Sequence, residues 1–148
     1  MALDTRLLKR VKDIVYIRYS QTLFWTHGWP HVENVEAYCE QLARLESEDP
    51  VVCGIAAYCH DLGRLKEEKR RFIYRILGKK DHAAYSIKPT KNILVEIGIK
   101  TSEAQIILEA VRVHSDKFYF GNNNIARILR DADKADGFGP WGFKNGWI

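Results

Sequence analysis

The sequence predicts one all-α domain over residues 1–148, built as a bundle of about six or seven helices. Three observations support this fold class. Apolar residues recur three or four positions apart along almost the whole chain, strand-like alternation between turn signals is missing, and no linker, repeat or low-complexity tract divides the sequence. A chain of 148 residues can bury one substantial core.

The first half is expected to contain three helices. The first covers about residues 4–19, and the second runs from Pro30, a residue suited to a first helical position, to about residue 46. Asp49 and Pro50 predict the start of a third helix. That helix, over residues 51–59, carries no charged side chain on any face, so we expect it to be the buried central element.

The middle of the chain is expected to contain two further helices. One follows from a charged stretch at residues 66–71, carries its apolar residues at 72–77 and is stopped by Gly78. The next is capped by Asp81, bends at Pro89 and is ended by Gly98.

Two more helices are expected near the C-terminus. Ser102 and Gln105 match a capping box, which predicts a helix that ends near residue 115. The last helix is expected over residues 123–137, after an irregular segment.

Composition narrows the class of protein. Apolar residues make up 46% and charged residues 28%, as in globular proteins, and no apolar run approaches the roughly 18 to 20 residues of a membrane span. The start is polar, which argues against a secretory signal. The three cysteines, Cys39, Cys53 and Cys59, lack a C-x-x-C spacing and lie among apolar residues, so we expect reduced thiols and a cytoplasmic location.

The net charge of +4 suits an anionic partner such as a nucleotide or a sugar phosphate. Proteins that bind no anion often carry the same charge. No run of five or more like charges and no nucleic-acid-binding motif is present, so a nucleic-acid partner is the weakest of the alternatives.

Four of the five histidines fall on apolar helix faces, namely His31, His60, His82 and His114. A single inward histidine is usually a hydrogen-bonded core residue. Four of them beside Asp61, which directly follows His60, favour a divalent cation instead, because an unpaired buried carboxylate costs several kcal/mol. A cation removes that cost by binding the carboxylate together with neutral imidazoles.

The last helix offers a further carboxylate to the same centre. Asp136 falls within its apolar stripe, Asp133 lies on the flank of the stripe, and Asp131 lies nearly opposite. Periodicity therefore favours Asp133 or Asp136 as the inward group and leaves Asp131 to solvent or to a position behind the ligands. The alternative is a solvated acidic helix end, although acids at a C-terminus oppose the helix dipole.

These residues resemble the HD-domain superfamily of metal-dependent phosphohydrolases. The resemblance rests on an ordered series: His31 in Trp-Pro-His-Val-Glu-Asn-Val, His60 and Asp61 in Ala-Ala-Tyr-Cys-His-Asp-Leu-Gly, and Asp133 in Leu-Arg-Asp-Ala-Asp-Lys-Ala-Asp. It covers residues from about 27 to 140. It implies an HD-domain helical bundle in which those four residues hold the metal.

The resemblance extends to residues around the four ligands. His82 and His114 look like the additional histidines of some subfamilies, which hold a second metal or contact the substrate phosphate. The stretch from Asp131 to Lys134 looks like that of a bacterial subgroup of small predicted hydrolases. Asp131, Asp136 and His27 are candidates for a place behind the metal ligands.

Positive side chains near the proposed ligands are candidates for phosphate binding. Arg64 and Lys134 each lie within a few residues of a ligand, and Lys66, Lys88 and Lys91 are weaker candidates. The aromatic segment at residues 25–29 could stack on a base, although aromatic residues at a helix start more often belong to the core.

The expected function is hydrolysis of a phosphate ester of a small phosphorylated metabolite, with a nucleotide favoured, by a phosphomonoesterase or phosphodiesterase. A His and Asp ligand set fits Mn²⁺, Fe²⁺, Co²⁺, Ni²⁺, Zn²⁺ or Mg²⁺, one or two per chain. Two alternatives from other classes are a metal-binding module without hydrolytic activity, in a regulatory or interaction role, and an HD-type di-iron oxygenase.

Overall fold

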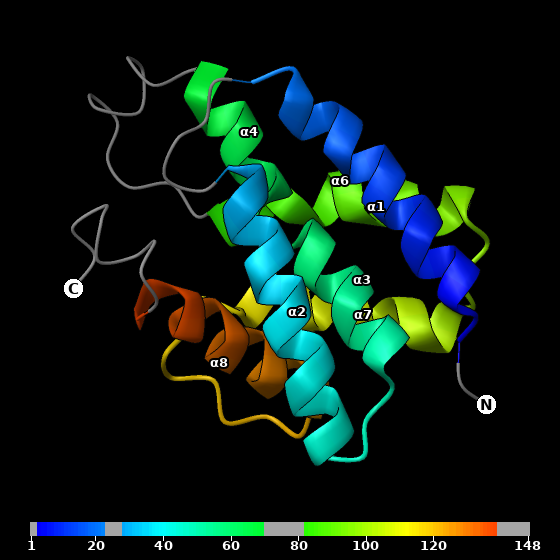
Figure 1. Cartoon of the computed structure of the whole chain (residues 1–148), viewed down its shortest axis with the longest axis vertical. Helices are drawn as coiled ribbons and strands as arrows, with labels where there is room; N and C mark the ends of the chain where they lie inside the picture. The colour runs from blue at the N-terminus through cyan, green and yellow to red at the C-terminus, as the bar shows by residue number, and fades with distance from the viewer. Residues whose placement is uncertain (1–2, 23–27, 70–81, 139–148) are drawn as a thin grey trace.

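The computed structural model describes residues 3–22, 28–69 and 82–138, with the backbone alone described for 66–69. All regular secondary structure in these ranges is helical, which confirms the predicted all-α class (Figure 1). None of the described helices has the length and apolar character needed to cross a bilayer.

Seven helices are described, and a central one is surrounded by the others (Figure 1). Helix α3 packs against α1, α2, α6, α7 and α8, while α4 packs mainly on α6. In chain order the helices are α1 (Thr5–Ser20), α2 (Trp29–Leu45), α3 (Pro50–Cys59), α4 (Leu62–Lys69), α6 (His82–Glu96), α7 (Thr101–Val113) and α8 (Asn124–Phe138).

The uncharged helix α3 is the buried centre, as the sequence predicts. Every residue from Val51 to Cys59 is buried. The Asp49 carboxylate accepts a hydrogen bond from the Val51 N–H at 2.8 Å and caps the helix, and its second oxygen accepts from the Leu3 N–H at 2.8 Å. Because α3 is capped and surrounded, its C-terminal end, where His60 and Asp61 lie, is fixed in the interior of the molecule.

One predicted helix start is wrong, and one helix is not predicted at all. Helix α7 begins at Thr101 after Lys100, because Gly98 adopts φ +74° and the Ile99 N–H donates to the Leu94 carbonyl, which closes α6 and leaves Lys100 extended. Ser102 is therefore inside the helix, where its hydroxyl donates to the Glu103 carboxylate rather than capping.

Helix α4 occupies a highly charged stretch directly after Asp61, for which no helix is expected. The helix predicted over residues 72–77 and the cap predicted at Asp81 lie outside the described residues. Helix α6 continues through Pro89. It ends before Gly98, as expected.

Helices α4 and α6 touch backbone to backbone at Gly63. A Cβ atom on Gly63 would lie 2.2 Å from the His82 carbonyl oxygen and 2.8 Å from the Ser86 nitrogen, so only glycine fits there. The Ser86 hydroxyl accepts a hydrogen bond from the Gly63 N–H at 2.8 Å and lies 2.9 Å from the carbonyl oxygen of His60. This junction holds α4, α6 and the end of α3 in one register.

Candidate metal centre

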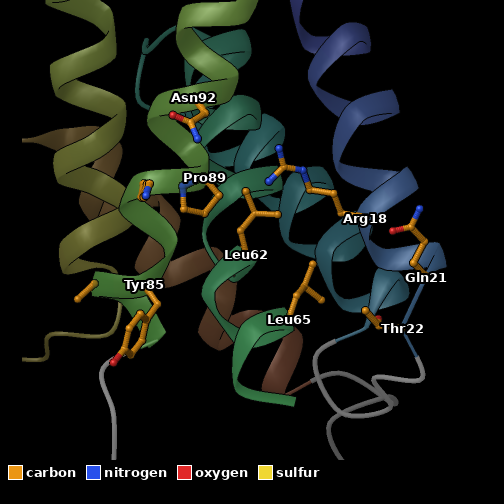
Figure 2. A pocket seen from close by; sticks show the side chains of 10 residues that line it. Arg18, Gln21, Thr22, Leu62, Leu65, Tyr85, Pro89 and Asn92 are labelled. Atoms are coloured by element: carbon orange, nitrogen blue, oxygen red, sulfur yellow. The ribbon is translucent and has the colours of Figure 1, made fainter. Parts of the chain in front are cut away.

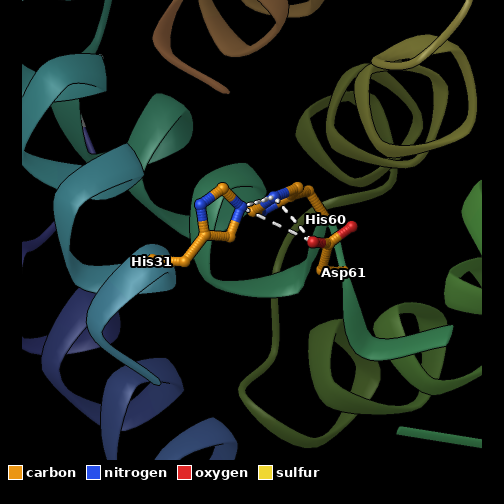
Figure 3. A group of neighbouring side chains, drawn as sticks. All are labelled: His31, His60 and Asp61. Carbon is orange, nitrogen blue, oxygen red and sulfur yellow. Dashed lines mark hydrogen bonds and ion pairs between the residues drawn. The ribbon is translucent and has the colours of Figure 1, made fainter. Parts of the chain in front are cut away.

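The four residues predicted to bind the metal come together from three helices. His31 lies in the first turn of α2, His60 caps the end of α3 and is followed by Asp61, and Asp133 lies on α8. The first three are fully buried, whereas the Asp133 side chain is 27% exposed. Figure 3 shows the His31 ring directed at His60 and Asp61.

The potential ligand atoms of these residues surround a common point. The Nε2 atoms of His31 and His60 are 3.3 Å apart, and Asp61 Oδ2 lies 3.5 and 3.4 Å from them (Figure 3). Asp133 Oδ1 lies 3.2 Å from His31 Nε2 and 3.7 Å from His60 Nε2. Ligands at about 2.1 Å from a tetrahedral or octahedral cation are about 3.0 to 3.4 Å apart. The residues present therefore fit a divalent cation.

A second group of ligand atoms faces the other oxygen of Asp61. Asp61 Oδ1 lies 3.5 Å from His82 Nε2 and 3.6 Å from His114 Nε2, and these two nitrogens are 3.3 Å apart. The carboxylate thus stands between two groups of imidazoles. This donor set has room for one cation or for two that share Asp61.

Two of the histidines are held by backbone carbonyls. The Nδ1 atoms of His60 and His114 donate to the carbonyl oxygens of Ala57 and Val111, each at 2.6 Å. A proton on Nδ1 leaves the Nε2 lone pair directed at the centre, which is the tautomer that binds a cation.

His31 is held by a carboxylate instead. Its Nδ1 donates to Asp136 Oδ2 at 2.7 Å, and the Asn34 side-chain amide donates to Asp136 Oδ1 at 2.8 Å. Asp136 is buried. Both inward candidates of α8 are therefore used: Asp133 faces the ligand atoms, and Asp136 lies behind His31. Sequence reasoning missed Asn34, although it lies one helical turn after His31 on the same face of α2.

The carboxylates create a strongly negative site around His31. Burial lowers the pKa of His31, but hydrogen bonds to Asp133, Asp136 and Asp61 outweigh it and raise that pKa to about 11. Burial raises the pKa of Asp133, but the hydrogen bond to His31 and the charge of His60 outweigh it and lower that pKa. Positive charge is therefore stabilised at this point, as a cation site requires.

The other three histidines differ in whether their interaction with Asp61 outweighs the effect of burial on the pKa. Burial lowers the pKa of His60 and of His82 to about 4, because the charge of Asp61 offsets only part of it. For His114 the hydrogen bond to Asp61 outweighs the effect of burial and raises the pKa. His60 and His82 are thus neutral at physiological pH, the form in which imidazole binds metals.

Arg64 lies at the edge of the second group. Its Nε is 3.1 Å from Asp61 Oδ1, and its Nη2 is 3.3 Å from His82 Nε2. Its side chain is 22% exposed, so part of this side chain faces solvent beside the centre. A guanidinium in this position can bind a phosphate oxygen.

Among the described residues, the remaining candidates on α6 and α8 are exposed rather than buried in this cluster. Asp131 is at the surface with 58% of its side chain exposed, and it is Asp136 that is buried behind the ligand His31. Lys134 and Lys91 are exposed on α8 and α6. His27 and the side chain of Lys66 lie outside the described residues.

The aromatic residue at the start of α2 belongs to the packing of the helices. Trp29 stacks on Tyr58 with a centroid distance of 5.8 Å and an interplanar angle of 12°, and Tyr16 meets its edge at 5.1 Å. The core interpretation is thus favoured for Trp29, while Trp25 lies outside the described residues.

Comparisons with known proteins agree with this architecture. No curated protein matches the chain. A crystal structure of a predicted HD superfamily hydrolase from an uncultured Thermotogales bacterium matches with a TM-score of 0.71, 22% sequence identity, and coverage of 97% of this chain and 73% of that one. At this identity the likeness shows the fold. The family model for the HD domain matches residues 28–137, which include all six clustered His and Asp residues, and the chain therefore belongs to the HD-domain family.

Proposed function

We propose that the protein is a metal-dependent phosphohydrolase that cleaves a phosphate ester of a small phosphorylated metabolite, with a nucleotide as the favoured substrate. The observation that carries the proposal is the Asp61 carboxylate held between two groups of ligand atoms, His31, His60 and Asp133 on one side and His82 and His114 on the other. The similarity to a predicted HD superfamily hydrolase supports hydrolysis as the reaction.

A bound divalent cation lowers the pKa of a water molecule and polarises a phosphoryl oxygen, the two requirements for hydrolysis of a phosphate ester. The side chains determine how the phosphate reaches it. Asp133, Arg64 and His82 are 27%, 22% and 17% exposed, whereas His31 and His114 are buried. The phosphate therefore approaches from the partly exposed side, where Arg64 binds and orients its oxygens.

Phosphomonoesters and phosphodiesters both present the oxygens that such a centre binds. The net charge of +4 favours a dianionic or polyanionic substrate over a neutral one. Together with the reduced thiols expected for the three cysteines, this supports a cytoplasmic nucleotide or related metabolite as the substrate.

Metal content and a substrate screen on one preparation test the proposal. The purified protein is analysed for bound metals, then assayed with Mn²⁺, Co²⁺, Ni²⁺ and Mg²⁺ against an aryl phosphate, a bis-aryl phosphate and a nucleotide panel. We expect turnover that Asp61→Asn abolishes, by at least about a thousandfold, since that substitution weakens both groups of ligands. Asp13→Asn removes the same charge from an exposed ion pair on α1 and should leave turnover unchanged.

A metal bound at this centre without turnover of any ester would instead support a module with a regulatory or interaction role. The shared carboxylate also fits a di-iron centre, so an oxygenase follows that module as a further candidate. Two irons per chain with oxygen consumption, and no phosphate release, would replace hydrolysis by that reaction.

A further inference from the structure

A cavity of about 550 Å³ lies between the C-terminal turn of α1, helix α4 and helix α6, and none of the six clustered His and Asp residues lines it (Figure 2). This volume falls within the range of small-molecule sites, roughly 300 to 1,000 Å³. Leu62, Leu65 and Pro89 form an apolar part of its wall, and amide and hydroxyl side chains form a polar part. Such a wall suits a ligand with an apolar body and a few polar groups.

The charged side chains among the described lining residues are all positive. Arg18 on α1 and Lys88 on α6 line it, and no carboxylate is among its described lining residues. No ion pair to either cation is found among the described residues. Figure 2 shows the Arg18 side chain extending from α1 toward Leu62. The cavity therefore favours a ligand that carries a negative charge.

The cavity is separate from the metal centre because it uses another face of α4. Asp61 and Arg64 are directed at the centre, whereas Leu62 and Leu65 line the cavity. Leu65 comes one residue after Arg64, which is about 100° around α4, and Leu62 is the first residue of that helix, directly after Asp61.

On helix α6 the separation is along the helix axis. His82 faces the centre, whereas Lys88 and Pro89 come six and seven residues later, about 9 to 10 Å along the helix. A ligand in the cavity therefore does not lie among the metal ligands.

The contact between α4 and α6 at Gly63 couples the cavity to the metal centre. Because α4 and α6 touch there without space for a Cβ atom, the position of Asp61 relative to His82 depends on how the two helices are held together. Ser86 adds hydrogen-bonding contacts to Gly63 and to the carbonyl of His60. A ligand that contacts both helices from the cavity reduces their relative motion and so favours the arrangement that binds a cation.

We propose that this cavity is an effector site for a small organic anion with an apolar body, and that its occupation strengthens cation binding at the metal centre. The binding part stands on the cavity alone. The regulatory part rests on the proposed metal centre.

The probe for this site is 8-anilinonaphthalene-1-sulfonate, which combines an aromatic body with one negative charge and becomes fluorescent when bound. We expect saturable binding that the double variant Arg18→Gln/Lys88→Gln weakens about tenfold, as loss of charged hydrogen bonds does. Arg10→Gln/Lys91→Gln removes the same charge from exposed positions on the same two helices and should change binding less than twofold. Ala84→Trp, at an exposed residue of the cavity wall, should abolish binding.

Metal binding is measured separately, by titration of the metal-free protein with Co²⁺ in the presence and absence of saturating probe. We expect the probe to tighten Co²⁺ binding at least fivefold in the wild type and not in Ala84→Trp, whose folding is checked by thermal unfolding. Equal probe binding in wild type, the Arg18→Gln/Lys88→Gln variant and Ala84→Trp would overturn the site. Displacement of the probe by inorganic phosphate from the Co²⁺-loaded protein would show one site instead of two, and unchanged Co²⁺ affinity would overturn the regulation.

The failure of this inference can be told from that of the proposed function. Absence of phosphate ester turnover bears on the proposed function alone, because the probe and Co²⁺ titrations need no substrate.

Discussion

The carboxylate of Asp136 should determine how tightly the centre binds a cation, although it contributes no ligand atom. Its two oxygens accept hydrogen bonds from His31 Nδ1 at 2.7 Å and from the Asn34 amide at 2.8 Å. Asp136→Asn keeps the shape of the side chain and replaces one acceptor oxygen by an NH₂ group. Either the His31 Nδ1–H or the Asn34 amide N–H then faces the new NH₂ group, so that two hydrogen-bond donors oppose each other.

The rearrangement that relieves this conflict harms the metal site. If the new amide donates to His31 Nδ1, the proton of the neutral ring moves to Nε2, the atom directed at His60, Asp61 and Asp133. A protonated Nε2 cannot bind a cation. Loss of such a supporting residue typically costs 10- to 100-fold in metal affinity, or about 1.4 to 2.8 kcal/mol.

The assay is a competition between the protein and a chromophoric chelator for Zn²⁺ or Co²⁺, with the metal-free protein prepared by dialysis. Asp131→Asn is the matched control, because it removes the same charge from an exposed position of the same helix. Asn34→Ala should weaken affinity less than Asp136→Asn, since His31 keeps its acceptor. Wild-type affinity in Asp136→Asn, or an equal loss in Asp131→Asn, would refute the reasoning.

Three further perturbations test the framework around the centre. Gly63→Ala should destabilise the protein by about 1 to 3 kcal/mol and lower its metal content, because the added Cβ meets the backbone oxygen of His82. Gly54→Ala meets only flexible side chains, those of Leu8 and Glu36, and should cost less, as urea unfolding can show. Metal at a hundredfold excess over Kd should add about 2.7 kcal/mol of stability, which a chelator removes in a thermal melt. In the chelated protein the folded-state pKa of His31, about 11, lies above the ordinary 6.5. Protonation of His31 therefore stabilises the fold fully below pH 6.5 and progressively less as the pH rises toward 11, so the melting temperature should fall between pH 7 and pH 10 without metal and hold with it.

Periodicity was sufficient for the fold class and for the inward histidines, because both depend on local spacing. His31, His60 and His114 are buried as their helix faces predict. The predicted cap is also confirmed, since the Asp49 side chain caps the start of α3. Helix α4 was not predicted because its charged residues carry no apolar stripe. It follows a fixed turn and packs on α6 through Gly63, a tertiary contact that spacing does not show.

The choice between Asp133 and Asp136 shows where sequence reasoning ends. Periodicity left both as inward groups, and the structure gives each a different neighbour: Asp133 approaches His31 Nε2 at 3.2 Å, and Asp136 approaches Nδ1 of the same ring at 2.7 Å. The two acids are three residues apart on α8 and meet opposite nitrogens of one imidazole. Only the position of α8 against α2 decides which acid meets which nitrogen, and that position follows from packing of the whole core.

The centre combines elements that are each stable for reasons unrelated to catalysis. Helix α3 ends in the interior because its own residues are apolar, and α8 begins where Asn123 accepts a hydrogen bond from the Ala126 N–H at 3.1 Å. These elements bury polar groups at a cost in desolvation free energy. Asp61, Asp136 and three imidazoles lie among apolar side chains. A bound cation would offset this free-energy cost of burial, since the carboxylates that raise the pKa of His31 would hold a metal in place of the proton. The packing of an ordinary helical core thus positions the candidate ligands, and a bound metal would compensate for their burial.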